Sequence, residues 1–143
     1  MYSFSLVTAP AAEPVSLSEV KTYLRIATAD DDTLLTALIS AARQWAERYT
    51  GRAFITQTWQ VALDSPPTDS NAVSLPRAPL QSVASVTYYS DNDAETVWAP
   101  SNYFVDTLRE PGRLVLRIGA TWPCSTRAAN GIIITYAAGY GSN

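Results

Sequence analysis

Histidine is absent from this 143-residue chain, and cysteine and lysine occur once each. The absence of histidine excludes catalytic triads built on that residue, zinc sites with histidine ligands, and the commonest general base near neutral pH. The single cysteine, Cys124, has no partner for a disulfide within the chain and no histidine to activate its thiol. We therefore expect no catalytic residues, no metal and no cofactor.

The chain also carries little charge. Charged residues make up 16% of it, and the net charge is -3. Proteins that bind duplex DNA directly present a basic surface that neutralises phosphates, so direct DNA binding is not expected. No apolar run approaches the ~18 residues of a membrane span, and the first residues lack the basic flank of a signal peptide. We expect a soluble protein that makes no membrane contact and is not exported through a signal peptide.

The first third of the chain has a helical pattern. Residues 15–26 begin with a capping box formed by Ser16 and Glu19. A second helix is predicted over 33–50, preceded by three aspartates and closed by Gly51. Its apolar residues recur with the 3.6-residue period and define one face: Leu34, Leu35, Leu38, Ile39, Ala42, Trp45, Ala46 and Tyr49.

After Gly51 the apolar period changes from 3.6 to 2, which is typical of strands. One long strand is predicted over 55–63, and shorter ones follow between turn sequences, at 72–75, 83–89, 96–98, 103–106, 113–118 and 131–136. The sequence therefore predicts an α+β fold in which a helical pair packs on or beside an antiparallel sheet, sandwich or small barrel. The predicted division is 1–52, an N-terminal segment with the helical pair; 53–136, the β domain; and 137–143, a flexible tail.

The strand-rich part offers two alternatives with a chemical function. The acidic turn that contains Asp91, Asp93 and Glu95 could bind a divalent cation, although such residues more often form a solvated turn. Trp59 and Tyr88, with further aromatic residues, could stack on sugars, although burial in the core explains them more simply. A carbohydrate-binding or glycan-active β module therefore remains the alternative function.

Several segments, taken in order, resemble a known family. They are PVSLSEVKTYLRI, LLTALISAARQWAERYTGRAFITQTW, LPRAPLQSVASVTYY and ITYAAGYG. Together they resemble the head-tail connector, or adaptor, proteins of long-tailed bacteriophages and gene transfer agents, over about Glu13 to Gly141. The most specific part of the resemblance is YTGRAFITQTW followed by LPRAPLQSV.

The resemblance implies a structural virion protein that is not an enzyme. Many copies would form a ring beneath the portal protein at the capsid vertex and seat the tail or its stopper or terminator protein. DNA would pass through the ring without specific binding. Such a protein would be assembled in the cytoplasm of the bacterial host and would lie in the neck of the particle.

A closed ring needs one patch on each copy that meets a different patch on the next. We predict the first patch on the face of the 33–50 helix that carries polar and small residues, although a helix face that only contacts solvent has the same pattern. The predicted residues are Ala37, Ser40, Ala41, Arg43, Gln44, Glu47 and Arg48. For the portal or tail contact we predict the terminal segment, because an aromatic residue flanked by glycines could insert into a neighbouring groove: Gly139, Tyr140, Gly141, Ser142 and Asn143.

Overall fold

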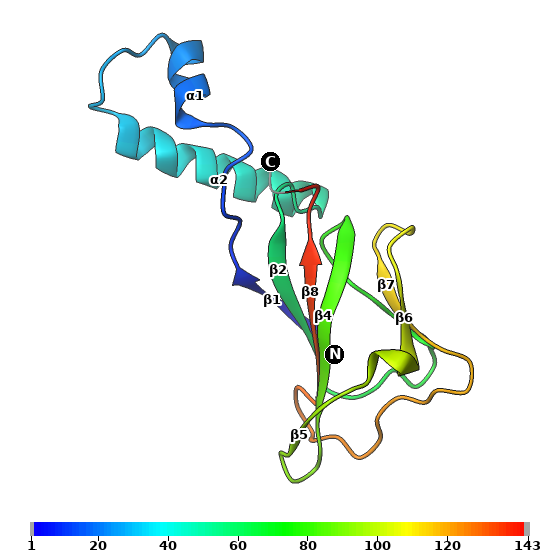
Figure 1. Cartoon of the computed structure of the whole chain (residues 1–143). Coiled ribbons are helices and arrows are strands. Elements are labelled where there is room, and N and C mark those ends of the chain that lie inside the picture. Colours follow the sequence, from blue (N-terminus) through cyan, green and yellow to red (C-terminus); the bar gives the residue numbers. More distant parts are fainter. Residues whose placement is uncertain (1, 142–143) are drawn as a thin grey trace.

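The computed structural model describes residues 2–141 and has the α+β architecture expected from the sequence (Figure 1). Within these residues, two α-helices and one short 3-10 helix are combined with eight strands. In chain order the elements are β1 (Tyr2–Thr8), α1 (Leu17–Leu24), α2 (Asp32–Thr50), β2 (Gln57–Leu63), β3 (Ala72–Ser74), β4 (Leu80–Tyr89), β5 (Glu95–Val97), η1 (Pro100–Asn102), β6 (Tyr103–Asp106), β7 (Arg113–Leu116) and β8 (Ile132–Ala138).

A five-stranded antiparallel sheet, in the order β1-β2-β8-β4-β5, forms the larger layer. In β8 every second side chain is fully buried, from Ile132 through Ile134 and Tyr136 to Ala138. β2 has the same alternation, with Trp59 and Val61 on the buried face. The period of two in the sequence therefore marks the face of each strand that contacts the core.

A three-stranded antiparallel sheet, in the order β3-β7-β6, packs against the buried face of the larger sheet. Leu114 of β7 is fully buried and joins the same hydrophobic cluster as Ile134 of β8. The two sheets share this core but stay separate in their strand order. Of the three predicted forms of the β domain, the structure is therefore a sandwich and not a closed barrel.

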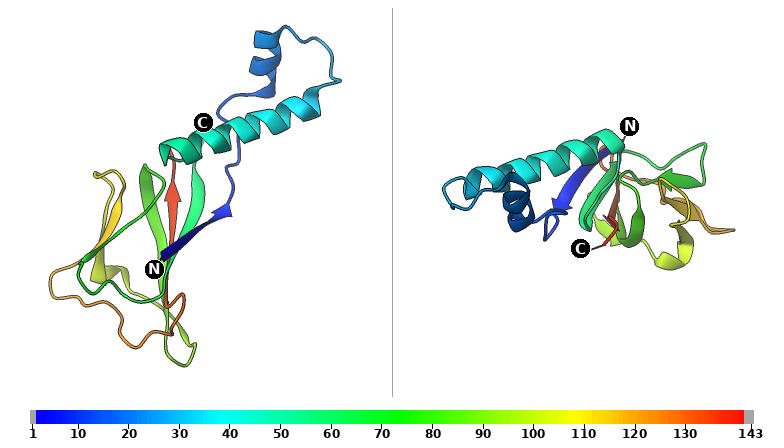
Figure 2. Two further views of the ribbon diagram at one scale, coloured as in Figure 1. Left: turned by 180° about the vertical axis from the view of Figure 1, so that it is seen from behind. Right: turned by 90° about the horizontal axis from the view of Figure 1, so that it is seen from above.

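The helical pair extends away from the sandwich (Figures 1 and 2). The C-terminal part of α2 lies over one end of the strands, and its N-terminal part and α1 project beyond the sheets. Ser16 and Glu19 form the predicted capping box, and Gly51 ends α2 with a φ of 69°. None of the helices in the described part of the chain is both long and apolar enough to cross a membrane.

Strand β1 was not predicted from the sequence. It pairs with β2, whose residues come about fifty positions later, and it forms one edge of the five-stranded sheet. Phe4 pairs opposite Val61 and Leu6 opposite Trp59, so both lie on the face of the sheet that contacts the core. The predicted division into three parts stays a prediction. β1, from the first predicted part, nevertheless pairs with the β domain, and β8 extends two residues past its predicted boundary.

Candidate subunit interface

A stripe of large apolar side chains on α2 is exposed to solvent. It consists of Leu34, Leu38, Trp45 and Tyr49, which are 58%, 54%, 69% and 80% exposed, and we refer to these four residues as the α2 stripe. The Trp45 and Tyr49 rings stack at 5.4 Å between centroids with an angle of 5° between their planes. Soluble monomers rarely expose contiguous apolar patches of this kind, and those that exist usually contact another molecule.

The buried side of α2 is narrower than its apolar pattern indicates. Leu35 is the one buried apolar residue of the helix, while Ile39 and Ala46 are half-buried. The apolar positions identified in the sequence thus divide into a side that faces the chain and a side that faces solvent. Periodicity orients a helix about its own axis, but it does not say what covers the apolar face.

Two of the seven residues predicted for the subunit interface are buried within the chain. Arg43 is 8% exposed and Glu47 is 5% exposed. Arg43 donates from Nη1 to Glu47 at 2.8 Å and from Nε to Glu13 at 2.7 Å. These two residues therefore hold α2 in place, and their side chains are not free to contact a neighbouring copy.

Glu47 connects α2 to the sandwich through its second carboxylate oxygen. Oε1 accepts a hydrogen bond from the Phe54 amide at 2.8 Å and another from the Gln57 side chain at 2.6 Å. Burial alone would lower the pKa of Arg43, but the hydrogen bond to Glu13 and the charges of both carboxylates raise it above its ordinary value. The buried ion pair is fully hydrogen-bonded, which is the condition under which such a pair is tolerated.

One signal in the sequence could have located this network. Gln57 occupies a position in β2 where the alternation calls for an apolar residue, between Ile55 and Trp59. A polar side chain on a buried face must find a hydrogen-bond partner. Glu13 gave no comparable signal, because the turn in which it lies has no periodic pattern.

The other predicted interface residues lie on the accessible sides of α2. Ala37, Ala41, Gln44 and Arg48 are exposed, and Ser40 is half-buried. Arg48 and Ala41 follow Trp45 and Leu38 at helical spacing, so the small and polar strip adjoins the α2 stripe. The interface assignment stays a prediction for these five residues.

The segment predicted to contact the portal or the tail is attached to the chain as far as it is described. Gly139 donates to the Pro79 carbonyl at 2.9 Å, and the Gly141 carbonyl accepts from Thr56 at 2.8 Å. Gly139 has a φ of 138°, and a Cβ atom there would lie 2.5 Å from the carbonyl oxygen of Ile55. This position therefore requires glycine.

Tyr140 is 62% exposed, but its hydroxyl has a partner within the chain. Arg52 donates to that hydroxyl and also pairs with the Glu110 carboxylate. The hydroxyl partner and the backbone hydrogen bond from Tyr140 to Phe54 leave the exposed face of the ring as the part available to a neighbour. Ser142 and Asn143 lie outside the described residues.

The structure gives the alternative functions little support. Trp59, Trp98 and Tyr103 are buried, and Trp98 stacks on Trp122 at 5.3 Å, so they form no open platform for sugars. Among residues 2–141 no group of three or more acidic or cysteine side chains is arranged to hold a metal ion. In the acidic turn, Asp93 forms an ion pair with Arg127 at 3.4 Å.

The α2 stripe is an exposed apolar surface of the kind by which proteins contact one another. Residues 14–99 match the family described as "Phage gp6-like head-tail connector protein", and the chain belongs to this family. It is therefore a structural head-tail connector protein, as the resemblance in its sequence predicted. A comparison with curated proteins finds no match.

Solved structures with the same fold come from gene transfer agent (GTA) particles. A chain in "Neck of empty GTA particle computed with C6 symmetry" has a TM-score of 0.81 and 22% identity, covering 99% of this chain and 73% of its own length. A chain in "Virion of native gene transfer agent (GTA) particle" has a TM-score of 0.75 and 23% identity, covering 98% and 73%. A chain in "Neck of native GTA particle computed with C12 symmetry" has a TM-score of 0.74 and 23% identity, covering 99% and 71%.

Proposed function

We propose that this protein forms a homo-oligomeric ring in the neck of a phage or gene transfer agent particle. The ring joins the capsid vertex, at the portal protein, to the stopper or terminator protein of the tail. DNA passes through its channel without specific binding, and the protein catalyses no reaction. Assembly takes place in the cytoplasm of the bacterial host.

The observation that carries this proposal is the exposed α2 stripe in a chain of the connector family. The sandwich buries the apolar residues between its two sheets and leaves single ones such as Val97 and Phe104 exposed. The α2 stripe instead places four large apolar side chains in solvent along one helix that projects from the sandwich. A second copy packed on this face would remove the apolar surface from water, at about 25 cal/mol per Å² buried. The symmetric necks to which the similar chains belong support a ring as the form of that association.

The net charge supports the proposed channel. At -3 the chain does not supply the excess of cations by which proteins hold DNA phosphates. A ring of such chains would let DNA slide through it. The portal or tail contact at residues 139–143 also belongs to this proposal, with the exposed ring face of Tyr140 as its anchor.

Incorporation into particles tests the proposed function. The gene is deleted in the particle-producing host and supplied from a plasmid, and purified particles are analysed by mass spectrometry. We expect the wild-type chain in the particles and at least about a tenfold loss of the Leu38→Glu/Trp45→Glu variant, because charges would replace apolar contacts at every copy. Leu108→Glu makes the same kind of change at a side chain that is 97% exposed on the β6–β7 hairpin, and it serves as the matched control.

Two results would contradict the proposal in different ways. Absence of the wild-type chain from intact, infective or transducing particles would rule out the neck function. Normal incorporation of the double variant would leave the neck function standing but remove the α2 stripe from the interface. Unchanged incorporation after deletion of residues 139–143, in a variant that unfolds at the wild-type temperature, would remove the terminal contact.

A further inference from the structure

We propose that the turn before α2 in one copy docks into a basic recess at the other end of α2 in the next copy. The turn contributes Asp30 and Asp31, and the recess contributes Arg48 and Arg77. This inference rests on the proposed ring and names the two surfaces that would meet in it.

The recess is a cavity of about 320 Å³ beneath the C-terminal half of α2. Ala9, Pro10 and Glu13 form one wall, and Ser40, Gln44 and Arg48 of α2 form another. Arg43 pairs with both Glu13 and Glu47, so these three side chains together carry one excess negative charge. Arg48 and Arg77 have no carboxylate partner among residues 2–141, so the lining has three arginines against two carboxylates and keeps one excess positive charge.

Arg77 is held rigidly at the recess. Its guanidinium carbon lies 5.0 Å from the centroid of the Trp59 ring and 5.6 Å from that of the Phe4 ring. Nη1 donates to the Glu47 carbonyl at 2.6 Å, while Nε is buried with no hydrogen-bond partner. A guanidinium positioned in this way loses little freedom when it binds a carboxylate.

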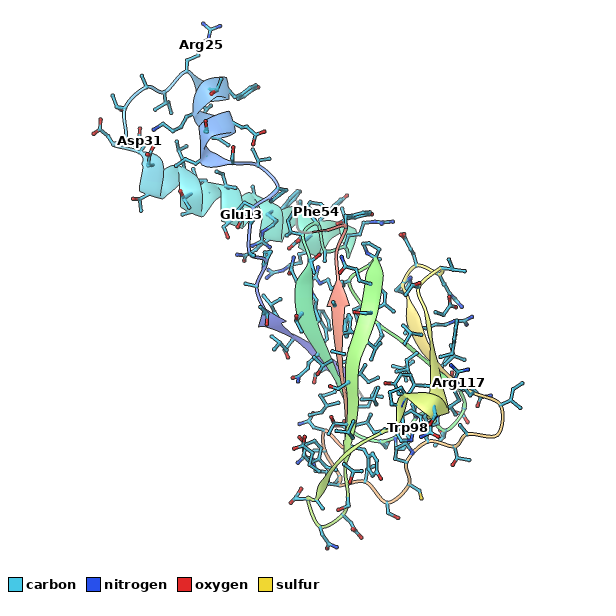
Figure 3. The ribbon with its side chains drawn as sticks, in the orientation of Figure 1. Glu13, Arg25, Asp31, Phe54, Trp98 and Arg117 are labelled. Atoms are coloured by element: carbon cyan, nitrogen blue, oxygen red, sulfur yellow. The ribbon has the colours of Figure 1, made fainter. Side chains whose placement is uncertain are left out.

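The turn between α1 and α2 has the complementary charge. Asp32 pairs with Lys21 at 2.5 Å, whereas Asp30 and Asp31 are exposed and have no side-chain partner in the described part of the chain. The turn lies at the projecting end of the molecule, where Figure 3 labels Asp31 beyond the first turn of α2. These two carboxylates are therefore open to another molecule.

The two charged surfaces cannot meet within one chain. Asp31 and Arg48 are separated by nearly the whole of α2, and a helical rise of 1.5 Å per residue places them about 25 Å apart. Only a second copy can bring the acidic turn to the basic recess. Because two different surfaces meet, the contact is head-to-tail, which is the kind that closes a ring.

The charged contact is continuous with the apolar one. Arg48 lies three residues after Trp45 on α2, so the recess opens beside the α2 stripe. A neighbour whose helical pair lies along the α2 stripe can therefore place its turn at Arg48. In this arrangement the apolar stripe contributes burial and the charges set the register.

Charge reversal tests the contact in the assembled particle. Asp30→Arg changes the turn and Arg48→Glu changes the recess, and each variant is supplied alone, combined in one chain, or co-expressed as two different chains. We expect each variant alone to lose about tenfold in incorporation, because the mismatch recurs at every contact. The matched controls are Asp91→Arg and Arg109→Glu, which make the same charge changes at exposed sites elsewhere.

Restoration distinguishes the contact from an effect on folding. The chain that carries both substitutions regains an opposite-charge pair at every contact. When the two single variants are co-expressed, alternation of the two chains around the ring restores an opposite-charge pair at every contact. The changed turn of one chain meets the changed recess of the other, and at the next contact the two unchanged surfaces meet. Recovery to near wild-type incorporation in both cases is the expected result.

The outcomes separate this inference from the proposed function. Suppose that wild-type particles contain the chain. If the single variants then incorporate normally, or if their incorporation is not restored by the combined substitutions, the docking is overturned and the ring proposal stays intact. Absence of the wild-type chain from the particles would overturn both. Losses in the two control variants equal to those of the test variants would also overturn the docking, because they would reflect net charge alone.

Discussion

At the scale of single residues, the attachment of α2 to the sandwich depends on a buried carboxylate. Glu47 accepts hydrogen bonds from Arg43, Phe54 and Gln57, and its side chain is almost completely shielded from water. Removing one member of a buried ion pair leaves the other charge without compensation. Glu47 therefore contributes more to the stability of the folded state than its position on the polar face of the predicted helix indicates.

We predict that Glu47→Ala lowers the free energy of unfolding by about 3–5 kcal/mol, because the Arg43 charge and the Gln57 amide lose their partner. Urea denaturation followed by circular dichroism measures this change. Glu95→Ala removes a carboxylate from an exposed position in β5 and is expected to change stability by less than about 0.5 kcal/mol. A loss below about 1 kcal/mol in Glu47→Ala would contradict the assigned role.

A second prediction concerns pH. The hydrogen bond from Arg113 Nε, at 2.9 Å, lowers the pKa of Asp106 below its ordinary value. A carboxyl group whose pKa is lower in the folded state contributes stability above its unfolded pKa and loses it as the pH falls through the folded pKa. We expect Asp106→Asn to reduce the loss of stability that accompanies acidification below about pH 5.

The measurement is the midpoint of urea denaturation at pH 7 and at acidic pH. Arg113→Met should reduce the same acid-dependent loss, because it removes the hydrogen bond that lowers the pKa of Asp106. If both variants kept the wild-type difference between the two pH values, the assignment to Asp106 would be wrong.

At the scale of elements, α1 depends on its own cap more than on packing. The helix has eight residues and none of them is buried, and Lys21 links it to Asp32 of α2. The Ser16 hydroxyl and the Glu19 carboxylate close its first turn through three hydrogen bonds. Isolated helices of this length are marginal in water, so the capping box has a large share in keeping α1 folded.

Ser16→Ala is therefore predicted to destabilise α1 by about 1 kcal/mol without unfolding the sandwich. Hydrogen exchange measures this locally: the amides of 20–24 should exchange several times faster, while those of β8 keep their wild-type protection. Ser18→Ala changes a neighbouring exposed serine within the helix and is the control. Equal exchange in wild type and Ser16→Ala would mean that α1 does not need its cap.

At the scale of the whole molecule, we expect folding and assembly to use different apolar residues. Ile134 is fully buried at the centre of the sandwich, whereas Leu38 is 54% exposed on α2. Truncation of Ile134 removes packing contacts within the chain. A charge introduced at Leu38 contacts only solvent until another copy packs on this helix.

We predict that Ile134→Ala lowers the free energy of unfolding by about 2–5 kcal/mol, while Leu38→Glu changes it by less than about 0.5 kcal/mol. Incorporation into particles should show the reverse order when the two variants are compared below their unfolding temperatures. Thermal unfolding of the purified chains and the mass-spectrometric particle assay measure the two effects. A large loss of stability in Leu38→Glu would show that the α2 stripe contributes to folding of the single chain.

The sequence by itself determined the features that depend on neighbouring residues. The capping box, Gly51 and the alternation in β2 and β8 act through contacts a few positions apart, and their patterns could be interpreted directly. The order of the segments was enough to indicate the family. These predictions were confirmed because local backbone preferences and apolar periodicity do not depend on distant residues.

Only the tertiary structure decided which surfaces are covered. β1 depends on a partner about fifty residues away, and Arg43 and Glu47 became buried because Glu13 and Gln57 reach them from other elements. The α2 stripe is exposed because no other part of the described chain folds over it. An apolar face looks the same in a sequence whether its own chain or a second copy covers it, since the hydrophobic effect depends on removal from water and not on the identity of the partner.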